Sequence, residues 1–260
     1  LLRSPKDLKT WQEALEWFAF QGPPTGDPKL NAEQAEAQKR DTPLQFLLPK
    51  TVYGSAGLPD TRAASDDELM RHAIVENERL QLAVWGELYL QILRAIVQRS
   101  DFPGTEDLRE FFDGPTTPPS AADAIARALG HFGRGDYDEA AHILVPRLEA
   151  MVRALAQGIG ITTFSVPDNR NPGGFVPLGV LFSRLRPPGL PDEAWLRYGE
   201  HLLTDRDGRN LRNELAHGLI PTVSAADAAL LIHYACHLSS LRVPPQGGID
   251  DPPASEASPE

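Results

Sequence analysis

The chain has a single cysteine in 260 residues, so it cannot form an intrachain disulfide. Its first residues also lack the basic and then apolar order of a secretory signal peptide. Both absences favour a reducing compartment, and we expect a cytoplasmic protein. The chain does not begin with methionine, which leaves room for an upstream domain.

Long apolar runs and excess positive charge are missing as well. The most apolar stretch, residues 82–97, is interrupted by Glu87, Gln91 and Arg94, whereas a bilayer span needs about 20 predominantly apolar residues. We therefore expect no membrane anchor. Acidic residues outnumber basic ones by 36 to 25, for a net charge of −11, which excludes a general positive field for coating nucleic acid. Any contact with a polyanion must be local.

Helical periodicity fills the segments between clusters of proline and glycine. Ser65 and Glu68 have the spacing of a capping box and open an apolar run that ends near Arg99. Within it Leu80, Val84, Leu88 and Ile92 recur at every fourth residue, beside a second apolar row that includes Trp85 and Tyr89. This pattern predicts one long, mostly buried helix over 65–99.

Two later cap signatures, at 120–123 and 136–139, predict a helical hairpin closed at Gly135. Pro146 falls inside the second helix of this pair, where a proline removes a hydrogen bond and kinks or splits the helix. Residues 158–175 combine β-branched residues with a Gly-rich turn and predict a short β-hairpin. Further helices are predicted at about 177–185, 192–203, 210–217 and 224–241.

The predicted fold class is therefore all-α, a helical bundle with one short β-hairpin. A Pro-rich break at 114–119 divides an N-terminal helical region, 1–119, from a C-terminal helical domain, 120–242. Residues 243–260 are mostly proline, glycine, serine and acidic residues, with almost no apolar content. We expect this tail to be disordered and dispensable for stability.

Common enzyme signatures are absent, among them the phosphate-binding loop, Gly-x-Ser-x-Gly, His-Glu-x-x-His and Cys-x-x-Cys. His233 and His237 form an i, i+4 pair beside Cys236, but zinc would need a further ligand that the sequence does not supply. We interpret these residues as polar edges of an apolar helix that face solvent. The sequence thus predicts no metal site and no cofactor.

Two other groups of polar and aromatic residues have an ordinary structural interpretation. His142 and Glu149 lie seven residues apart on one predicted helix and could share a face with a catalytic group, but a solvated face is the better interpretation. Trp195, Tyr198 and His201 surround Arg197 in the sequence and could stack on bases, but aromatic residues at helical spacing are more often part of a core.

The segment 207–218 carries the strongest candidate site. Asn210 is a natural N-cap, Arg212 and Asn213 follow at the second and third helical positions, and His217 closes the helix before Gly218. Free N–H groups, the helix dipole and Arg212 would together attract an anion. Because Arg212 and His217 are rotated apart by about 140° on one helix, two copies packed across a two-fold axis would enclose a phosphate better than one.

The residues from Arg212 to His217 match an Arg-Asn-x-x-x-His motif, and on this motif the chain resembles the HEPN superfamily (higher eukaryote and prokaryote nucleotide-binding domains). More narrowly, it is similar to a bacterial family of unknown function defined by the same RNxxxH motif. The resemblance covers residues 120–242. It implies a HEPN-like helical bundle, a homodimer formed through the motif helix, and a role in bacterial toxin or antiviral defence systems.

By this resemblance the protein would be a metal-independent endoribonuclease. The implied catalytic residues are Arg212, Asn213 and His217, with Arg209 and Asn210 contacting the substrate. The partners expected from the sequence are RNA or a nucleotide, a second copy of the chain, and an antitoxin or upstream domain. The alternative is a HEPN-like module without catalysis that binds a nucleotide or holds a dimer.

Overall fold

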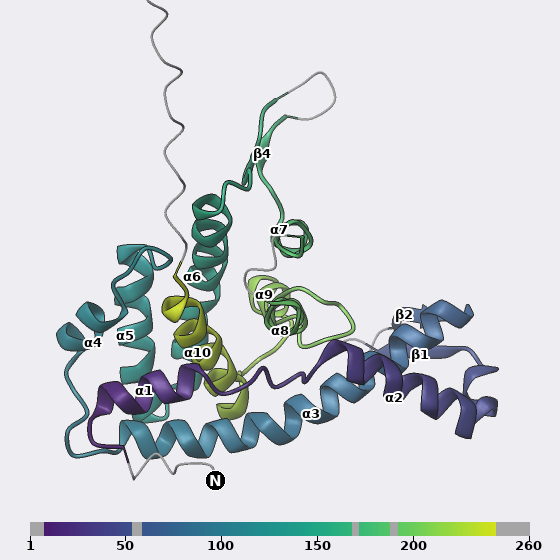
Figure 1. The fold of residues 1–260 in the computed structure, drawn as a ribbon, viewed down its shortest axis with the longest axis horizontal. Helices are drawn as coiled ribbons and strands as arrows, with labels where there is room; N and C mark the ends of the chain where they lie inside the picture. The colour runs from purple at the N-terminus through teal and green to yellow at the C-terminus, as the bar shows by residue number, and fades with distance from the viewer. Residues whose placement is uncertain (1–7, 54–58, 168–171, 188–191, 243–260) are drawn as a thin grey trace, which may run out of the picture.

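A computed structural model describes residues 8–53, 59–167, 172–187 and 192–242 of the chain. This part is mostly helical, which confirms the predicted all-α class (Figure 1). The predicted tail, 243–260, and part of the predicted turn, 168–171, lie outside the described residues. The helices are α1 (Trp11–Ala19), α2 (Pro28–Asp41), the 3-10 helix η2 (Pro43–Phe46), α3 (Asp66–Val97), α4 (Thr105–Phe112), α5 (Pro119–Arg134), α6 (Tyr137–Gly158), α7 (Leu178–Leu185), α8 (Glu193–Leu203), α9 (Leu211–Ala216) and α10 (Ala225–Ser240).

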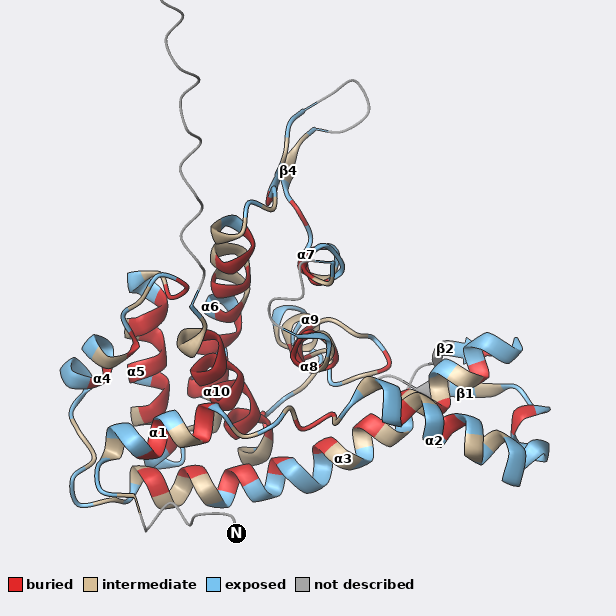
Figure 2. Cartoon of the chain, in the orientation of Figure 1, coloured by how far each residue is buried: buried red, intermediate tan, exposed pale blue. Residues whose placement is uncertain are grey.

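One hydrophobic core joins the N-terminal and C-terminal regions. Helix α10 lies at its centre: every residue from Asp227 to Leu238 is buried, and α10 packs against α1, α3, α5 and α6 (Figure 2). Apolar side chains of α1 and α3 belong to the same cluster as those of α5, α6, α7 and α8. A smaller cluster around Phe46 and Leu69 holds η2 to the start of α3.

The predicted helical hairpin is confirmed as α5 and α6, closed by Gly135 in the left-handed conformation (φ 87°). Helix α5 begins at Pro119 and not at the predicted Ser120 cap, because the fixed φ of proline suits the first helical turn. Helix α6 runs through Pro146 without a break, so of the two predicted outcomes, a kink or a split, the split is excluded. Its buried residues on both sides of Pro146 pack on the core, and this packing outweighs one lost hydrogen bond.

The Ser65 capping box is confirmed, since Ser65 and Glu68 bond to each other's backbone N–H groups. The prediction that α3 is mostly buried is wrong. Four large apolar residues remain open to solvent, with exposed fractions of 68% for Leu80, 63% for Val84, 40% for Trp85 and 44% for Leu88. The apolar residues of α3 extend around more of the helix than α1, α2 and α10 cover.

By length and composition alone α3 could also cross a membrane, and a third of its most apolar window is buried in the fold (33%). Its contacts with α10, α2 and α1 are those of a helix packed on one side against a folded domain.

The described part of the chain contains two small antiparallel hairpins. Strands β3 (Phe164–Ser165) and β4 (Gly174–Phe175) form the predicted one, with Phe164 directly opposite Phe175. Strands β1 (Lys50–Tyr53) and β2 (Pro59–Ala63) form a second hairpin that the sequence pattern did not predict. Strands this short carry too few residues for an alternating pattern to stand out.

Candidate functional site

The predicted motif follows a loop that the end of α8 holds in place. The carbonyl of His201, in the last turn of α8, accepts hydrogen bonds from the N–H groups of Arg209 (2.8 Å) and Asn210 (3.3 Å). Gly208 lies against the same residue, and a Cβ at this position would be 2.5 Å from the His201 carbonyl oxygen. The loop can therefore fold back onto α8 only with glycine at this position.

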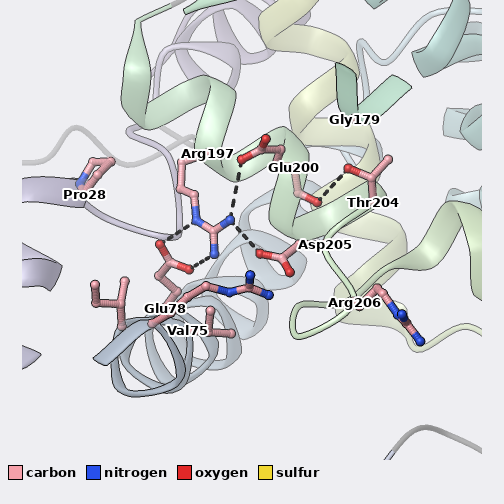
Figure 3. A pocket seen from close by; sticks show the side chains of 11 residues that line it. Pro28, Val75, Glu78, Gly179, Arg197, Glu200, Thr204, Asp205 and Arg206 are labelled. Carbon is pink, nitrogen blue, oxygen red and sulfur yellow. Dashed lines mark hydrogen bonds and ion pairs between the residues drawn. The ribbon is translucent and has the colours of Figure 1, made fainter. Parts of the chain in front are cut away.

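A largely buried arginine ties the same loop to α3 (Figure 3). Arg197 of α8 donates to both carboxylate oxygens of Glu78 (2.8 and 2.5 Å) and to Asp205 of the loop (2.6 Å). Glu78 is only 1% exposed, and burial raises its pKa while Arg197 acts against that change. Burial would lower the pKa of Arg197, but the hydrogen bond and charge of Glu78 and the charge of Asp205 raise it overall.

A cavity of about 570 Å³ opens beside this network. Its lining contains three arginines and three carboxylates, which balance in charge: Arg71, Arg197 and Arg206, with Glu78, Glu200 and Asp205. The cations are already engaged; Arg71, for example, pairs with Asp207 of the loop at 2.5 Å. We therefore interpret the ion pairs around this cavity as structural, because they attach residues 204–210 to α3 and α8.

The motif helix α9 is short and begins in an unusual way. Asn210 has φ 52°, and no other described non-glycine residue has a positive φ. Its position as N-cap is confirmed, but the predicted capping bond to the backbone is absent. Its Oδ1 instead accepts from Nδ2 of Asn213 (2.7 Å). Since α9 has only six residues, its dipole is small, and its N-terminus alone offers little attraction for an anion.

Arg212 faces α6 and is held from two sides. Its Nη1 donates to Oδ1 of Asn213 (2.9 Å) and its Nε lies 3.3 Å from Oε2 of Glu149. Glu149 also accepts from Arg153, one helical turn further along α6 (2.5 Å). Two arginines thus share one carboxylate, which leaves a local charge of +1 in an acidic protein. Sequence reasoning missed Arg153, although its i, i+4 spacing from Glu149 is a visible signal.

A groove of about 280 Å³ lies between α6 and α9 at this point. Arg212 and Leu215 of α9 line one side, and Glu149, Pro146 and His142 of α6 line the other. The exposed His142 agrees with the predicted solvated face, whereas Glu149 is half-buried, and packing of α9 onto α6 makes both residues part of the groove wall. His142 Nδ1 lies 2.8 Å from the carbonyl of Asp138, which leaves Nε2 as the acceptor nitrogen.

The structure separates the other predicted site residues. His217 is the C-cap of α9 and is exposed, and its side chain bonds to no described residue. Arg209 pairs with Asp227 at the start of α10 (3.3 Å) and does not line the groove. Within one chain, the groove therefore brings together Arg212 and a histidine that sequence reasoning set aside, His142, while Asn213 and His217 lie outside its lining.

The interpretation of Trp195, Tyr198 and His201 as core residues is confirmed, since each is less than 9% exposed. The prediction that His233 and His237 turn polar edges to solvent is wrong. Both are buried, and His237 stacks on Trp195 with ring centroids 3.3 Å apart.

Burial lowers the pKa of three histidines in this part of the core. It lowers the pKa of His201 and of His233 to about 3, and the pKa of His237 to about 4. In the described part of the chain, no group of three or more histidine, cysteine and acidic side chains could hold a metal ion.

No family model, curated protein or solved structure matches this chain. The functional assignment therefore depends on the side chains of α6 and α9.

Proposed function

We propose that the protein is a metal-independent endoribonuclease of HEPN type that acts as a homodimer. The observation that carries this proposal is that Arg212 is held in one orientation and is still partly exposed. Its guanidinium is oriented by Asn213 and Glu149 at the wall of a groove, and its side chain is still 42% exposed. Its Nη2 bonds to no described residue, so it is available to a phosphate oxygen.

In the proposed reaction, His217 removes the proton from a ribose 2′-hydroxyl, and the oxygen attacks the adjacent phosphorus. Arg212 neutralises the charge that develops on the phosphoryl oxygens, while Asn213 holds Arg212 in place. The 5′-oxygen leaves and takes up a proton from solvent water, and His217 returns its proton to the solvent. The products are a 2′,3′-cyclic phosphate and a 5′-hydroxyl end. Because the RNA supplies its own nucleophile, the step needs no metal-bound water.

In the proposed dimer, a second chain supplies the histidine that one chain does not place beside Arg212. His217 is exposed beyond the groove, together with Gly218 and Leu219, so the histidine of a second copy could approach the Arg212 of the first. This arrangement supports a site made of two chains. The motif resemblance adds a defence-related role to the proposal, and the single cysteine adds a cytoplasmic location.

A fluorescence-quenched single-stranded RNA incubated in EDTA tests the proposal. We expect His217→Ala and Arg212→Ala to lower the rate by about 100- to 10,000-fold, as is typical for loss of a general base or of transition-state charge stabilisation. Arg127→Ala, which removes an exposed arginine paired with Asp123 on α5, is the matched control and should cleave normally. Equal rates in the wild type and in both site variants would reject the assignment.

His142→Ala identifies which histidine acts. If His142 shares the groove with Arg212 only as packing, this variant keeps most of its activity. Loss of cleavage in His142→Ala with full activity in His217→Ala would move the reaction into a single chain and remove the need for a dimer.

One observation favours the alternative of a module without catalysis. Glu149 already neutralises part of the charge on Arg212, and such a pair can simply fix α9 to α6. In that case the wild type is inert towards RNA in EDTA but binds a nucleotide, and Arg212→Ala weakens this binding.

A further inference from the structure

The β3–β4 hairpin carries two aromatic rings outside the core. Phe164 and Phe175 are paired across the strands, and their rings meet edge to face with centroids 5.7 Å apart. They are 48% and 69% exposed, respectively. Two phenylalanine rings on this projecting hairpin are exposed, so the fold does not gain the free energy that their burial would provide. Such exposed apolar groups indicate a binding surface.

Two arginines from different helices attach this hairpin to the fold. Arg153 of α6 donates to the carbonyl of Val176 (2.7 Å), and its guanidinium lies 5.0 Å from the centre of the Phe175 ring. Arg184 of α7 is exposed and donates to the carbonyl of Thr162 (2.8 Å). The base of the hairpin is thus cationic and aromatic, although the chain as a whole is acidic.

The hairpin is connected to the groove by direct contacts. Phe175 touches Arg153, Arg153 binds Glu149, and Glu149 pairs with Arg212. Glu149 and Arg153 are one turn apart on α6, about 6 Å along its axis. A chain of phosphates held at Arg212 would therefore pass close to the two rings.

We propose that Phe164 and Phe175 form a platform on which bases of a single-stranded RNA stack while its backbone is held at Arg212. Arg153, whose side chain is 15% exposed and donates to Glu149 and to the Val176 carbonyl, holds Phe175 in place. This inference rests on the proposed function and adds to it a surface that favours an unpaired strand. Aromatic faces combined with arginines are the usual means of holding single strands without reading their sequence. A duplex, whose bases are already stacked, would gain nothing from the rings.

Fluorescence anisotropy with a labelled 2′-O-methyl RNA of mixed sequence tests the platform, because this probe binds without being cleaved. We expect Phe164→Ala and Phe175→Ala each to raise the Kd by about 5- to 150-fold, the effect of losing one base stack. Phe175→Trp should retain binding. Val166→Ala is the matched control, since Val166 lies on the same hairpin and is 78% exposed but offers no ring. A labelled duplex of the same sequence should bind more weakly than the single strand.

The outcomes separate this inference from the proposed function. Unchanged Kd values in both alanine variants overturn the platform, while cleavage that depends on His217 would still support the nuclease. If the His217 and Arg212 variants cleave like the wild type but Phe175→Ala weakens binding, the platform stands and the nuclease assignment falls. If Phe175→Ala instead changes the molecular mass in light scattering with no effect on RNA binding, the hairpin is a protein contact and the inference is wrong.

Discussion

Acidification should destabilise this protein well before its carboxylates are protonated. Burial lowers the pKa of His201, His233 and His237 to about 3, 3 and 4, whereas the pKa of an unfolded histidine is about 6.5. Below pH 6.5 the unfolded chain therefore binds protons that the folded chain does not. The stability that the neutral histidines provide is complete above this pH and is lost as the pH falls towards 4.

The surroundings of each ring explain the size of the effect. Burial is the main cause for all three; the charge of Arg197 adds to it at His201, and His237 adds to it at His233. Asp205 and Asp192 oppose it only in part. At pH 5 each histidine costs about 2 kcal/mol, since one pH unit corresponds to about 1.36 kcal/mol, and the three together cost about 6 kcal/mol. The raised pKa of Glu78 recovers a fraction of this.

Urea unfolding followed by circular dichroism at pH 7.5, 6.5, 5.5 and 5.0 measures this loss. Domains of this kind have about 5–15 kcal/mol of stability in total, so we expect a large shift of the midpoint, or unfolding, at pH 5. His233→Phe should reduce the pH dependence by about a third, because it removes one of the three buried histidines. A free energy of unfolding that changes by less than about 1 kcal/mol between pH 7.5 and 5.0 would refute the reasoning.

Three further variants test the packing around the site. Glu78→Ala leaves Arg197 buried without its main partner and should cost about 3–5 kcal/mol in chemical unfolding; a loss below 1 kcal/mol would show that water replaces the carboxylate. Gly208→Ala should cost about 1–3 kcal/mol by overpacking against His201, and an unchanged Tm would mean that the loop has room to move. Because the proposed dimer forms through the motif helix α9, the double change Leu80→Glu with Val84→Glu on the exposed row of α3 should leave the mass in light scattering unchanged. A halved mass would place the dimer contact on α3 and contradict the proposed arrangement.

Much of the helical architecture follows from local signals. The capping box at Ser65, the left-handed Gly135 and the apolar rows of α6 and α10 each act within a few residues, so the sequence alone locates these helices. The β1–β2 hairpin was missed because strands of four and five residues offer little periodicity. The exposed row on α3 was misjudged for another reason: an apolar pattern shows which residues can be buried, whereas the neighbouring helices determine which are.

The motif residues could be predicted from the sequence, but the residues that contact them could not. Arg212, Asn213 and His217 stand out by type and spacing, yet the residue that orients Arg212 is Glu149, 63 positions earlier in the chain. No local signal connects two residues at that separation. The same applies to His142, which enters the groove only because α9 packs on α6.

Two arginines in this molecule illustrate how a structural ion pair differs from a binding group. Arg197 is 16% exposed and is surrounded by Glu78, Asp205 and Glu200, so its charge is matched and its donors are engaged. Arg212 is 42% exposed, and the one carboxylate beside it is shared with Arg153. The first arrangement holds α8 and the following loop to α3. The second leaves positive charge unmatched at the wall of a groove, which is where an anionic ligand gains most from binding.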